Sequence, residues 1–464
     1  MPRSRAHEIY MEWEKRWGSI IHVKLFGQST IIVNSFEAAT NMLDKKSAIY
    51  SDRPELPVAN EIVGLKDNIV SYPSGSRHRE ARAMMHRLIG TRANMEQFHS
   101  SIEAEMHRLL SRILERPGSD ELQKHIRLTV GATIMMIAHG YRVKEENDPY
   151  IRLADVWNRG FAEIIEPGAF WADTFPLLLR IPDWFPGTSW KDRAKAISVN
   201  YSTMVDVPHR FVKEQMERGT AVSSFTSAHL EQEGLSPERE KLIKFTAAAI
   251  MGGGADSTVA AISASFLAMT LYPDVQHKAQ AELDAVVGND RLPTFRDRER
   301  LPYLDALVKE VLRWNPVEPQ GIAHSVTEDD IQDGYFIPKG AVIVPNIWRF
   351  SRDEERYKNA TEFIPERFIA GDSKEAEPDP LGFVFGFGRR ICPGVQMANA
   401  QLFMACAMSL SVFDVLKVVQ DGKTVEPLHE FIDGIIRHPK TYECRIVPRS
   451  EKAKSLINQA QFAE

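Results

Sequence analysis

Residues 385–394 read Phe-Gly-Phe-Gly-Arg-Arg-Ile-Cys-Pro-Gly, and this short stretch holds the most specific information in the chain. Its three glycines allow a tight backbone turn and a close approach to a flat ligand. Pro393 suits the first turn of a helix, and the apolar residues 395–410 favour one. Cys392 therefore lies just before a helix N-terminus, where the dipole and the free amides favour a thiolate. Arg390 adds a positive charge close by.

A thiolate in a glycine-lined pocket with an arginine beside it is what an iron porphyrin needs. The thiolate supplies an axial ligand, and the arginine supplies a counter-charge for the propionates. One alternative is a buried structural cysteine beside a surface loop. Another is a phosphate-binding loop, which is disfavoured because residues 386–391 lack the third glycine of GxGxxG and follow no βαβ pattern.

The composition is that of an ordinary globular protein, with 464 residues, 43% hydrophobic and 26% charged. The net charge of −6 gives no reason to expect a nucleic acid as partner. Three cysteines, Cys392, Cys406 and Cys444, are too few for a disulfide framework, and no CxxC pair is present. We therefore expect free thiols and a reducing compartment.

The hydrophobic pattern predicts a mainly helical single domain over residues 1–464, with a minor β-sheet built from both ends of the chain. Residues 20–34 read as a hairpin that turns around Gly27-Gln28. The long apolar stretch 245–272 carries Asp256 at its middle, so a buried central helix is preferred to a membrane span. The strongest helices and remaining strands are expected at residues 95–114, 239–271, 302–314, 335–344 and 443–447.

The spacing of Phe385, Gly388, Arg390, Cys392 and Gly394 matches the pattern FxxGxRxCxG. This pattern resembles the haem-binding loop of the cytochrome P450 family, and the resemblance extends over most of the chain. It implies the cytochrome P450 fold and a haem b whose iron is bound by the cysteine. The other four residues of the pattern would surround the haem. The sequences of residues 166–171, 184–187 and 434–439 resemble those of fungal enzymes near the O-methylsterigmatocystin oxidoreductases.

Two further motifs precede the cysteine loop in the same sequence order as in the family. Glu310 and Arg313 form ExxR one helical turn apart, where side chains meet. Arg367 lies in a Pro-Glu-Arg-Phe segment, and in the family this arginine joins the Glu-Arg pair. Two guanidinium groups on one carboxylate would make a charge-assisted network behind the haem loop.

The central helix carries Gly-Gly-Ala-Asp-Ser-Thr at residues 253–258, which resembles the AGxDTT motif of the family. Consecutive glycines weaken a helix, and a distortion there would leave room for dioxygen. The resemblance implies that Asp256 and an alcohol relay protons as catalytic residues. The sequence departs from the family here, because Ser257 replaces the usual threonine and Thr258 follows, so either could supply the alcohol.

Three more residues are implied as haem-propionate ligands. Arg82 aligns with the arginine of the WRxxRRLLH stretch of the family, and His78 occupies its usual tryptophan position. His324 lies where the family offers histidine or arginine to the other propionate. For a lone histidine, an ordinary polar or core role remains the alternative.

The implied activity is NADPH-driven monooxygenation of a hydrophobic small molecule by O2. Because the chain has no nucleotide- or flavin-binding motif, electrons would come from a separate NADPH-cytochrome P450 reductase. The expected pocket walls are mostly apolar and lie at residues 161–170, 249–254, 317–323 and 432–436.

Two other functions stay open. A haem-thiolate isomerase or dehydratase would rearrange a peroxide without O2, although such an enzyme has little use for Asp256 beside an alcohol. A non-catalytic haem-binding protein is the other alternative. Family resemblance implies the endoplasmic reticulum membrane, but no N-terminal membrane anchor is present in the polar N-terminal sequence. The chain as written is therefore expected to be soluble, with membrane association only through a missing anchor.

Overall fold

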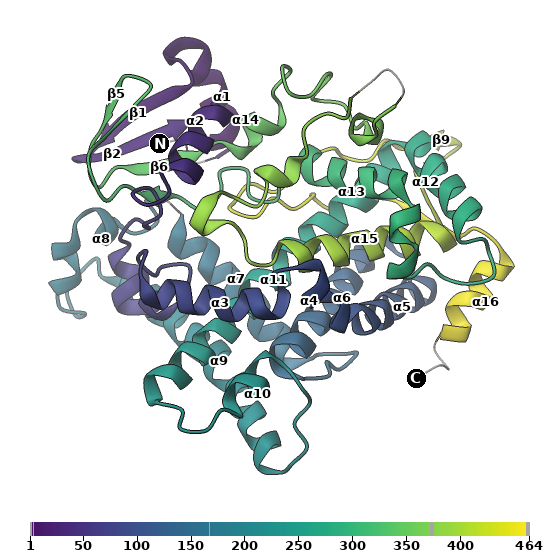
Figure 1. Ribbon diagram of the computed structural model, residues 1–464, viewed down its shortest axis with the longest axis horizontal. Coiled ribbons are helices and arrows are strands. Elements are labelled where there is room, and N and C mark those ends of the chain that lie inside the picture. Colours follow the sequence, from purple (N-terminus) through teal and green to yellow (C-terminus); the bar gives the residue numbers. More distant parts are fainter. Residues whose placement is uncertain (1, 3, 167, 372–374, 461–464) are drawn as a thin grey trace.

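The computed structural model describes residues 2, 4–166, 168–371 and 375–460. Helices form most of the molecule, and a small sheet lies at one corner with α1 and α14 beside it (Figure 1). The expected mainly α fold with minor β-structure is confirmed. The longer helices are α1 (Ala6–Trp17), α3 (Ser76–Ile89), α5 (His99–Glu115), α6 (Ser119–His139), α7 (Pro149–Ile165), α9 (Ser189–Glu217), α11 (Pro237–Leu271), α12 (Pro273–Val286), α13 (Pro302–Trp314), α15 (Val395–Val412) and α16 (Glu451–Ala460).

Short helical turns connect these helices. The short α-helices are α2 (Phe36–Ala39), α4 (Arg92–Met95), α8 (Trp171–Thr174), α10 (Phe225–Leu230) and α14 (Ile347–Ser351). Two π-helical segments, η1 (Thr40–Lys45) and η2 (Val58–Val63), lie near the N-terminus. The 3-10 segments are η3 (Leu65–Asp67), η4 (Glu96–Phe98), η5 (Pro176–Arg180), η6 (Phe295–Arg300), η7 (Pro365–Phe368), η8 (Pro380–Gly382) and η9 (Gly388–Arg390).

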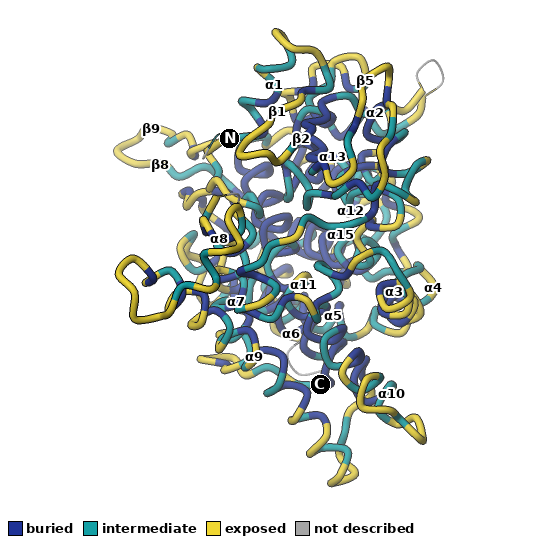
Figure 2. Tube along the Cα trace, turned by 90° about the vertical axis from the view of Figure 1, so that its left-hand side faces the viewer, coloured by how far each residue is buried: buried dark blue, intermediate teal, exposed yellow. Residues whose placement is uncertain are grey.

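The core is built around α11 and α15, and Figure 2 shows the buried stretches concentrated along the centre of the molecule. Local sequence explains the bounds of α11. The Ser236 side chain accepts the amide of Arg239, Pro237 occupies the first turn, and Pro273 follows the end. By length and composition α11 and α15 could each cross a membrane, but 78% of the apolar window of each is buried inside the fold. They are therefore core helices, as expected for the apolar stretch.

The main sheet has four strands in the order β1-β2-β6-β3. The hairpin turns at Phe26-Gly27, one residue earlier than expected, because both residues have positive φ and Leu25 pairs with Gln28. Strand β2 then pairs in parallel with β6. The strands in this sheet are β1 (Ile20–Leu25), β2 (Gln28–Val33), β6 (Val342–Pro345) and β3 (His324–Ser325).

Two expectations about the minor elements are wrong. The C-terminal strand β10 does not join the main sheet, because it pairs antiparallel with β7 directly after α15. Residues 95–114 are not one helix, because η4 separates α4 from α5. The remaining strands are β7 (Phe413–Leu416), β10 (Arg445–Pro448), β4 (Asp330–Gln332), β5 (Tyr335–Ile337), β8 (Val419–Gln420) and β9 (Lys423–Thr424).

Candidate functional site

The loop that carries Cys392 has a fixed backbone. The amide of Cys392 donates to the carbonyl of Phe385, with an N···O distance of 2.8 Å, and this bond closes the loop. Gly388 has a φ of +50°, and a Cβ there would lie 2.2 Å from the carbonyl oxygen of Leu43. Its amide also donates to the carboxylate of Asp44. Glycine is therefore required at position 388 because two backbone segments touch there.

The Cys392 thiol lies on an exposed residue, yet the surrounding chain strongly desolvates it. Burial raises the pKa of the thiol to about 11, and a hydrogen bond from the Gly394 amide at the start of α15 only partly offsets this. The amide at the helix N-terminus thus favours the thiolate, as expected, but burial has the larger effect on the pKa of the Cys392 thiol. A metal cation bound to the sulfur would reverse the preference, because it pairs the thiolate charge.

Two arginines expected near the haem use backbone carbonyls as their partners. Arg390 is buried and donates from Nε to the carbonyl of Ser51, at 2.7 Å, and from Nη2 to that of Tyr72. Arg82, on α3, donates from Nη1 to the carbonyl of Ile391, at 2.6 Å. Burial lowers the pKa of Arg390 to about 10. These bonds join the cysteine loop to α3 and to the segment that precedes α3. They do not neutralise the positive charge of Arg390 or of Arg82.

A third arginine, Arg53, was missed by the sequence reasoning. Its Nη1 donates to the carbonyls of Ile322 and Ala323, at 2.6 and 2.8 Å, while its Nε is buried without a partner. Burial and the charge of Arg390 lower its pKa to about 9. The only sequence signal was an arginine placed just before a proline, and no motif spacing connects that loop to the cysteine.

His78 and His324 belong to the same cluster. Burial and the neighbouring arginines lower the pKa of each imidazole to about 3, so both rings are neutral near pH 7. In His324, Nδ1 lies 2.8 Å from the carbonyl of Tyr50, which can only accept, so Nδ1 carries the hydrogen. Its Nε2 therefore carries no hydrogen and can only accept a hydrogen bond. It would donate to a carboxylate only after the ring gains a proton and becomes positively charged.

These five side chains test whether the site suits a haem. Arg53, Arg82, Arg390, His78 and His324 lie near enough to alter one another's protonation. Within the described ranges none of the three arginines forms an ion pair with a carboxylate, and the Arg53 Nε is an orphaned buried donor. A positive cluster without direct carboxylate pairs beside a cysteine fits a dianionic ligand, and the two propionates of haem provide two negative charges.

The ExxR pair and Arg367 meet as expected. Arg313 binds both carboxylate oxygens of Glu310, at 2.7 and 2.8 Å, and Arg367 approaches the same carboxylate at 3.2 Å. All three residues are buried. The amide of Ile364 also donates to Glu310, at 2.7 Å. The network joins α13 to η7 and holds the segment that precedes the cysteine loop.

The glycines of α11 open the interior without breaking the helix. The helix is continuous from Pro237 to Leu271, so the glycines do not end it. The missing side chain of Gly253, which is exposed and has no atom within 4 Å of a built Cβ, leaves room beside the helix. The Ser257 hydroxyl donates to the Gly253 carbonyl at 2.9 Å, whereas Thr258 is buried. The structure thus brings Ser257, and not Thr258, to the open side of the helix.

Asp256 has two cationic or proton-bearing partners. Its carboxylate accepts from Arg127 at 2.9 Å and lies 3.0 Å from the His438 Nε2. Arg127 also donates to Asp155, at 2.7 Å. Burial alone would raise the pKa of Asp256, but the His438 hydrogen bond and the Arg127 charge outweigh it and lower the pKa. Sequence reasoning missed these two partners because Arg127 comes from α6 and His438 from a C-terminal loop.

A groove of about 1020 Å³ lies between α3 and the cysteine loop and reaches Cys392. Arg79, Arg87 and Arg389 stand exposed along it, and no ion pair of theirs occurs in the part of the chain that the structure describes. The groove is therefore strongly positive on the side of the cysteine that faces solvent.

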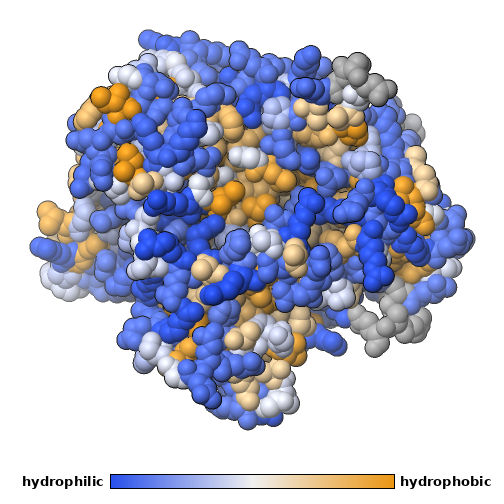
Figure 3. All heavy atoms as spheres, viewed as in Figure 1, coloured by the Kyte–Doolittle hydropathy of each residue, from blue (hydrophilic) through white to orange (hydrophobic). Residues whose placement is uncertain are grey.

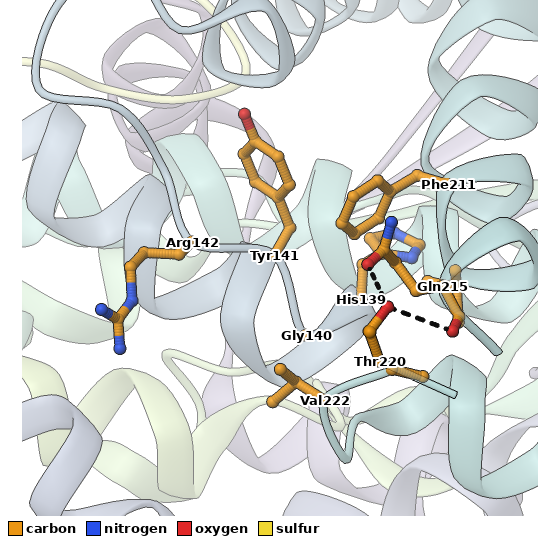
Figure 4. Close-up of a pocket in the computed structure, with 10 residues that line it drawn as sticks. His139, Gly140, Tyr141, Arg142, Phe211, Gln215, Thr220 and Val222 are labelled. Atoms are coloured by element: carbon orange, nitrogen blue, oxygen red, sulfur yellow. Dashed lines mark hydrogen bonds between the residues drawn. The ribbon is translucent and has the colours of Figure 1, made fainter. Parts of the chain in front are cut away.

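A smaller cavity of about 270 Å³ lies between the end of α6, α9 and the loop at residues 219–222. Figure 4 shows Tyr141 and Phe211 on its walls and the Thr220 hydroxyl bonded to both the carbonyl and the side chain of Gln215. Tyr141 donates to Asp148. Its lining includes none of the motif residues, and these polar groups already have partners within the fold.

Comparisons with known proteins agree with this arrangement. The cytochrome P450 family model matches residues 2–446. The chain is 50% identical to cytochrome P450 monooxygenase 208 of Postia placenta, over 98% of this chain and 89% of that protein. It is 44% identical to cytochrome P450 monooxygenase claR of Ampulloclitocybe clavipes (98% and 85% covered) and 37% identical to O-methylsterigmatocystin oxidoreductase of Aspergillus flavus (98% and 85%). A solved zebra fish cytochrome P450 with abiraterone matches with a TM-score of 0.76 and 21% identity, covering 96% of this chain and all of that one.

Proposed function

Because the chain belongs to the cytochrome P450 family of monooxygenases, we propose that it forms one such domain and inserts an oxygen atom from O2 into a hydrophobic small molecule. The observation that carries this proposal is Cys392, fixed on a loop beside the cluster of Arg53, Arg82 and Arg390. Cys392 would bind the haem iron, and the cluster, with His78 and His324, would hold the propionates. Once bound, haem activates O2, and thiolate ligation favours cleavage of the O–O bond.

The proton path is proposed to run through Asp256 and Ser257. Ser257 lies on the open side of α11, and Asp256 is the adjacent residue, held by Arg127 and His438. The lowered pKa keeps the Asp256 carboxylate ionised, so it accepts hydrogen bonds from the groups along the proposed path. Thr258 packs into the core and is assigned a structural role.

Replacing Asp256 with asparagine is expected to slow product formation on the order of 10²-fold, because an amide, unlike a carboxylate, neither takes up nor releases a proton near neutral pH. The spectrum of the reduced carbon monoxide complex should be unchanged, since Asp256 touches none of the proposed haem ligands. Asp155→Asn is the matched control, because Asp155 shares Arg127 but lies on α7. Turnover of Asp256→Asn at the wild-type rate would remove this residue from the mechanism.

Electrons are proposed to come from NADPH through a separate flavin reductase that docks on the positive groove at α3. The exposed Arg79, Arg87 and Arg389 would attract an acidic surface and bring it close to Cys392. Product formation that requires NADPH and reductase together tests the proposed function. Turnover of a hydroperoxide without either would contradict it and favour an isomerase or dehydratase.

Reversing two charges of the groove, in the double variant Arg79→Glu and Arg87→Glu, is expected to slow reduction by the reductase roughly tenfold at low salt. The difference should shrink as ionic strength rises, because exposed charges are screened. Reduction by dithionite should be unaffected. Arg152→Glu on α7 is the matched control, since this arginine is also exposed but lies outside the groove. Equal reduction of the double variant and wild type by the reductase would place the docking surface elsewhere.

A position at the endoplasmic reticulum membrane also remains a proposal. Phe26, Trp171, Phe175 and Leu177 are all exposed, and the rings of Phe26, Trp171 and Phe175 contact one another. Figure 3 shows apolar atoms gathered at the left edge of the molecule, where α8 lies. Such an aromatic patch suits the interface between water and lipid.

A further inference from the structure

The carboxylate of Asp256 has a different partner on each of its two oxygens. Arg127, on α6, donates to Oδ1 at 2.9 Å, and the Nε2 of His438 lies 3.0 Å from Oδ2. A guanidinium does not lose its proton in proteins, so Arg127 holds Asp256 without being able to pass a proton to it. Of the two side chains that the structure shows bonded to Asp256, only His438 can therefore exchange a proton with the carboxylate.

The two nitrogens of the His438 ring have different surroundings. Because the Asp256 carboxylate has a lowered pKa and is ionised, it only accepts, so the His438 Nε2 carries the hydrogen of the bond between them. Nδ1 is buried and has no hydrogen-bond partner among the residues that the structure describes. A buried lone pair without a donor is unfavourable, which points to an external donor such as water at this nitrogen. The neutral ring takes up a further proton there.

The backbone holds His438 in place independently of Asp256. Residues 430–440 fold back on themselves, because the amide of Ile432 donates to the carbonyl of His438 at 2.7 Å. The amide of Lys440 likewise donates to the carbonyl of Glu430, at 2.9 Å. A ring on a fixed backbone can gain and lose a proton without moving away from the carboxylate.

The charges around this pair favour proton entry at His438. On the other side of Asp256, Arg127 also donates to Asp155 on α7, at 2.7 Å. These two side chains are 26% and 28% exposed, against 14% for Asp256 and 11% for His438, so they lie between Asp256 and solvent. The fixed positive charge of Arg127 opposes an incoming proton on that side.

The remaining charged residues of the 430–440 loop bind groups other than the His438 ring, namely Arg437 on the Trp348 ring, Glu430 with Lys440, and Asp433 on the Arg5 amide. In the described part of the chain, the charged group bonded to the His438 ring is Asp256, from α11. Arg127 and Asp155 lie beyond it, on α6 and α7. The protonation of the ring is therefore coupled first to Asp256.

Resting on the proposed monooxygenase function, we propose that His438 is the residue from which Asp256 receives the protons that it passes to Ser257. Solvent water supplies a proton to Nδ1, the Nε2–H bond breaks, and an O–H bond forms on Oδ2. The ring is then neutral with its hydrogen on Nδ1, and one proton has moved from solvent to the carboxylate. After Asp256 has passed this proton on, exchange with water returns the ring hydrogen to Nε2.

Two variants separate proton supply from the hydrogen bond alone. Glutamine keeps an N–H that can donate to Asp256 but takes up no proton near neutral pH, whereas phenylalanine keeps a ring and removes the donor. With reductase and NADPH, oxidation of naphthalene, dodecanoic acid or an alkoxycoumarin is expected to be on the order of 10²-fold slower in both His438→Gln and His438→Phe. A His438→Gln variant that works at the wild-type rate would overturn the proposal, because the hydrogen bond would then be sufficient.

The pH profile and a double variant test whether the two residues form one path. The wild-type rate should fall as pH rises from about 6 to about 9, because the ring loses the proton that it donates, and His438→Gln should lose this dependence. Asp256→Asn combined with His438→Gln should be no slower than Asp256→Asn alone, since the second change acts on a path already broken. Additive losses, or a wild-type pH profile in His438→Gln, would place His438 outside the path.

A measurement without turnover tests the ring itself. In the reduced carbon monoxide complex with isotope-labelled histidine, nuclear magnetic resonance should show a signal that is lost in His438→Gln. This ring is expected to carry its hydrogen on Nε2 when neutral and a second one on Nδ1 after acidification. A neutral ring with its hydrogen on Nδ1 would overturn the proposal whether or not any probe is oxidised.

His429→Gln is the matched control, because His429 lies in the same C-terminal segment but stacks on Trp314, at 4.7 Å between ring centroids. It should change neither the rate nor the pH profile, and haem content should equal wild type in every variant. A missing thiolate-type spectrum, or no oxidation of any probe by the wild type, would contradict the proposed function itself. The two failures are therefore distinguishable.

Discussion

Replacing Cys392 with serine is expected to abolish the thiolate-type, red-shifted Soret band of the dithionite-reduced protein under carbon monoxide. The serine hydroxyl stays protonated near neutral pH and cannot supply the electron density of a thiolate ligand. The loop itself should survive, because its closure depends on the backbone bond between Phe385 and the residue at 392. The measurement is the absolute spectrum of the purified protein at equal concentration.

The two other cysteines provide internal controls. Cys406 and Cys444 are buried, and burial raises the pKa of each thiol to about 12. Cys406→Ser and Cys444→Ser should therefore keep the band at its wild-type position. Persistence of the band in Cys392→Ser, or its loss only in one of the controls, would show that another residue binds the iron.

Removing the carboxylate of Glu310 should produce the largest loss of stability. Glu310→Ala leaves the buried guanidinium group of Arg313 without its counter-charge and leaves Arg367 with Glu377 alone, and breaking such a buried pair costs about 3–5 kcal/mol. It also removes the acceptor of the Ile364 amide. Urea unfolding followed by tryptophan fluorescence measures the effect. Glu310→Gln keeps the shape of the side chain and should be intermediate, so it serves if the alanine variant does not fold.

An exposed ion pair serves as the control for the effect of burial on the stability that the Glu310 network contributes. Glu430 and Lys440 form an ion pair at 2.7 Å, and both side chains are at least half exposed. Glu430→Ala is expected to leave the unfolding midpoint unchanged, because solvent screens this interaction. If Glu310→Ala shifted the midpoint no more than Glu430→Ala, the network would not be what holds the segment before the cysteine loop.

Local signals in the sequence were sufficient for the elements that carry strong patterns. Helix α13 begins and ends at the expected residues, because its apolar positions repeat with helical spacing and Pro302 and Pro316 flank it. The hairpin was located to within one residue, since only the positive φ of Phe26 moved its turn. Residues 443–447 were correctly expected to include a strand, but no local signal could identify β7 as its partner.

The candidate site likewise contains residues that motif spacing identified and one residue that it did not. Cys392, Arg82, Arg390 and His324 were singled out by motif spacing, and the structure places them in one cluster. Arg53 joins that cluster although nothing in its sequence context indicates it. A motif reports only residues that keep a fixed distance along the chain, whereas a charge cluster depends on distances in space.

By itself, the sequence determined the family, the mainly helical fold and the cysteine that we propose as the iron ligand, because these follow from short patterns with fixed spacing. Only the tertiary structure decided the protonation and environment of the site. It desolvates the Cys392 thiol, turns Ser257 to the open side of α11, and pairs Asp256 with Arg127 and His438. Desolvation and charge pairing depend on segments far apart in the chain, so they arise only when the fold brings those segments together.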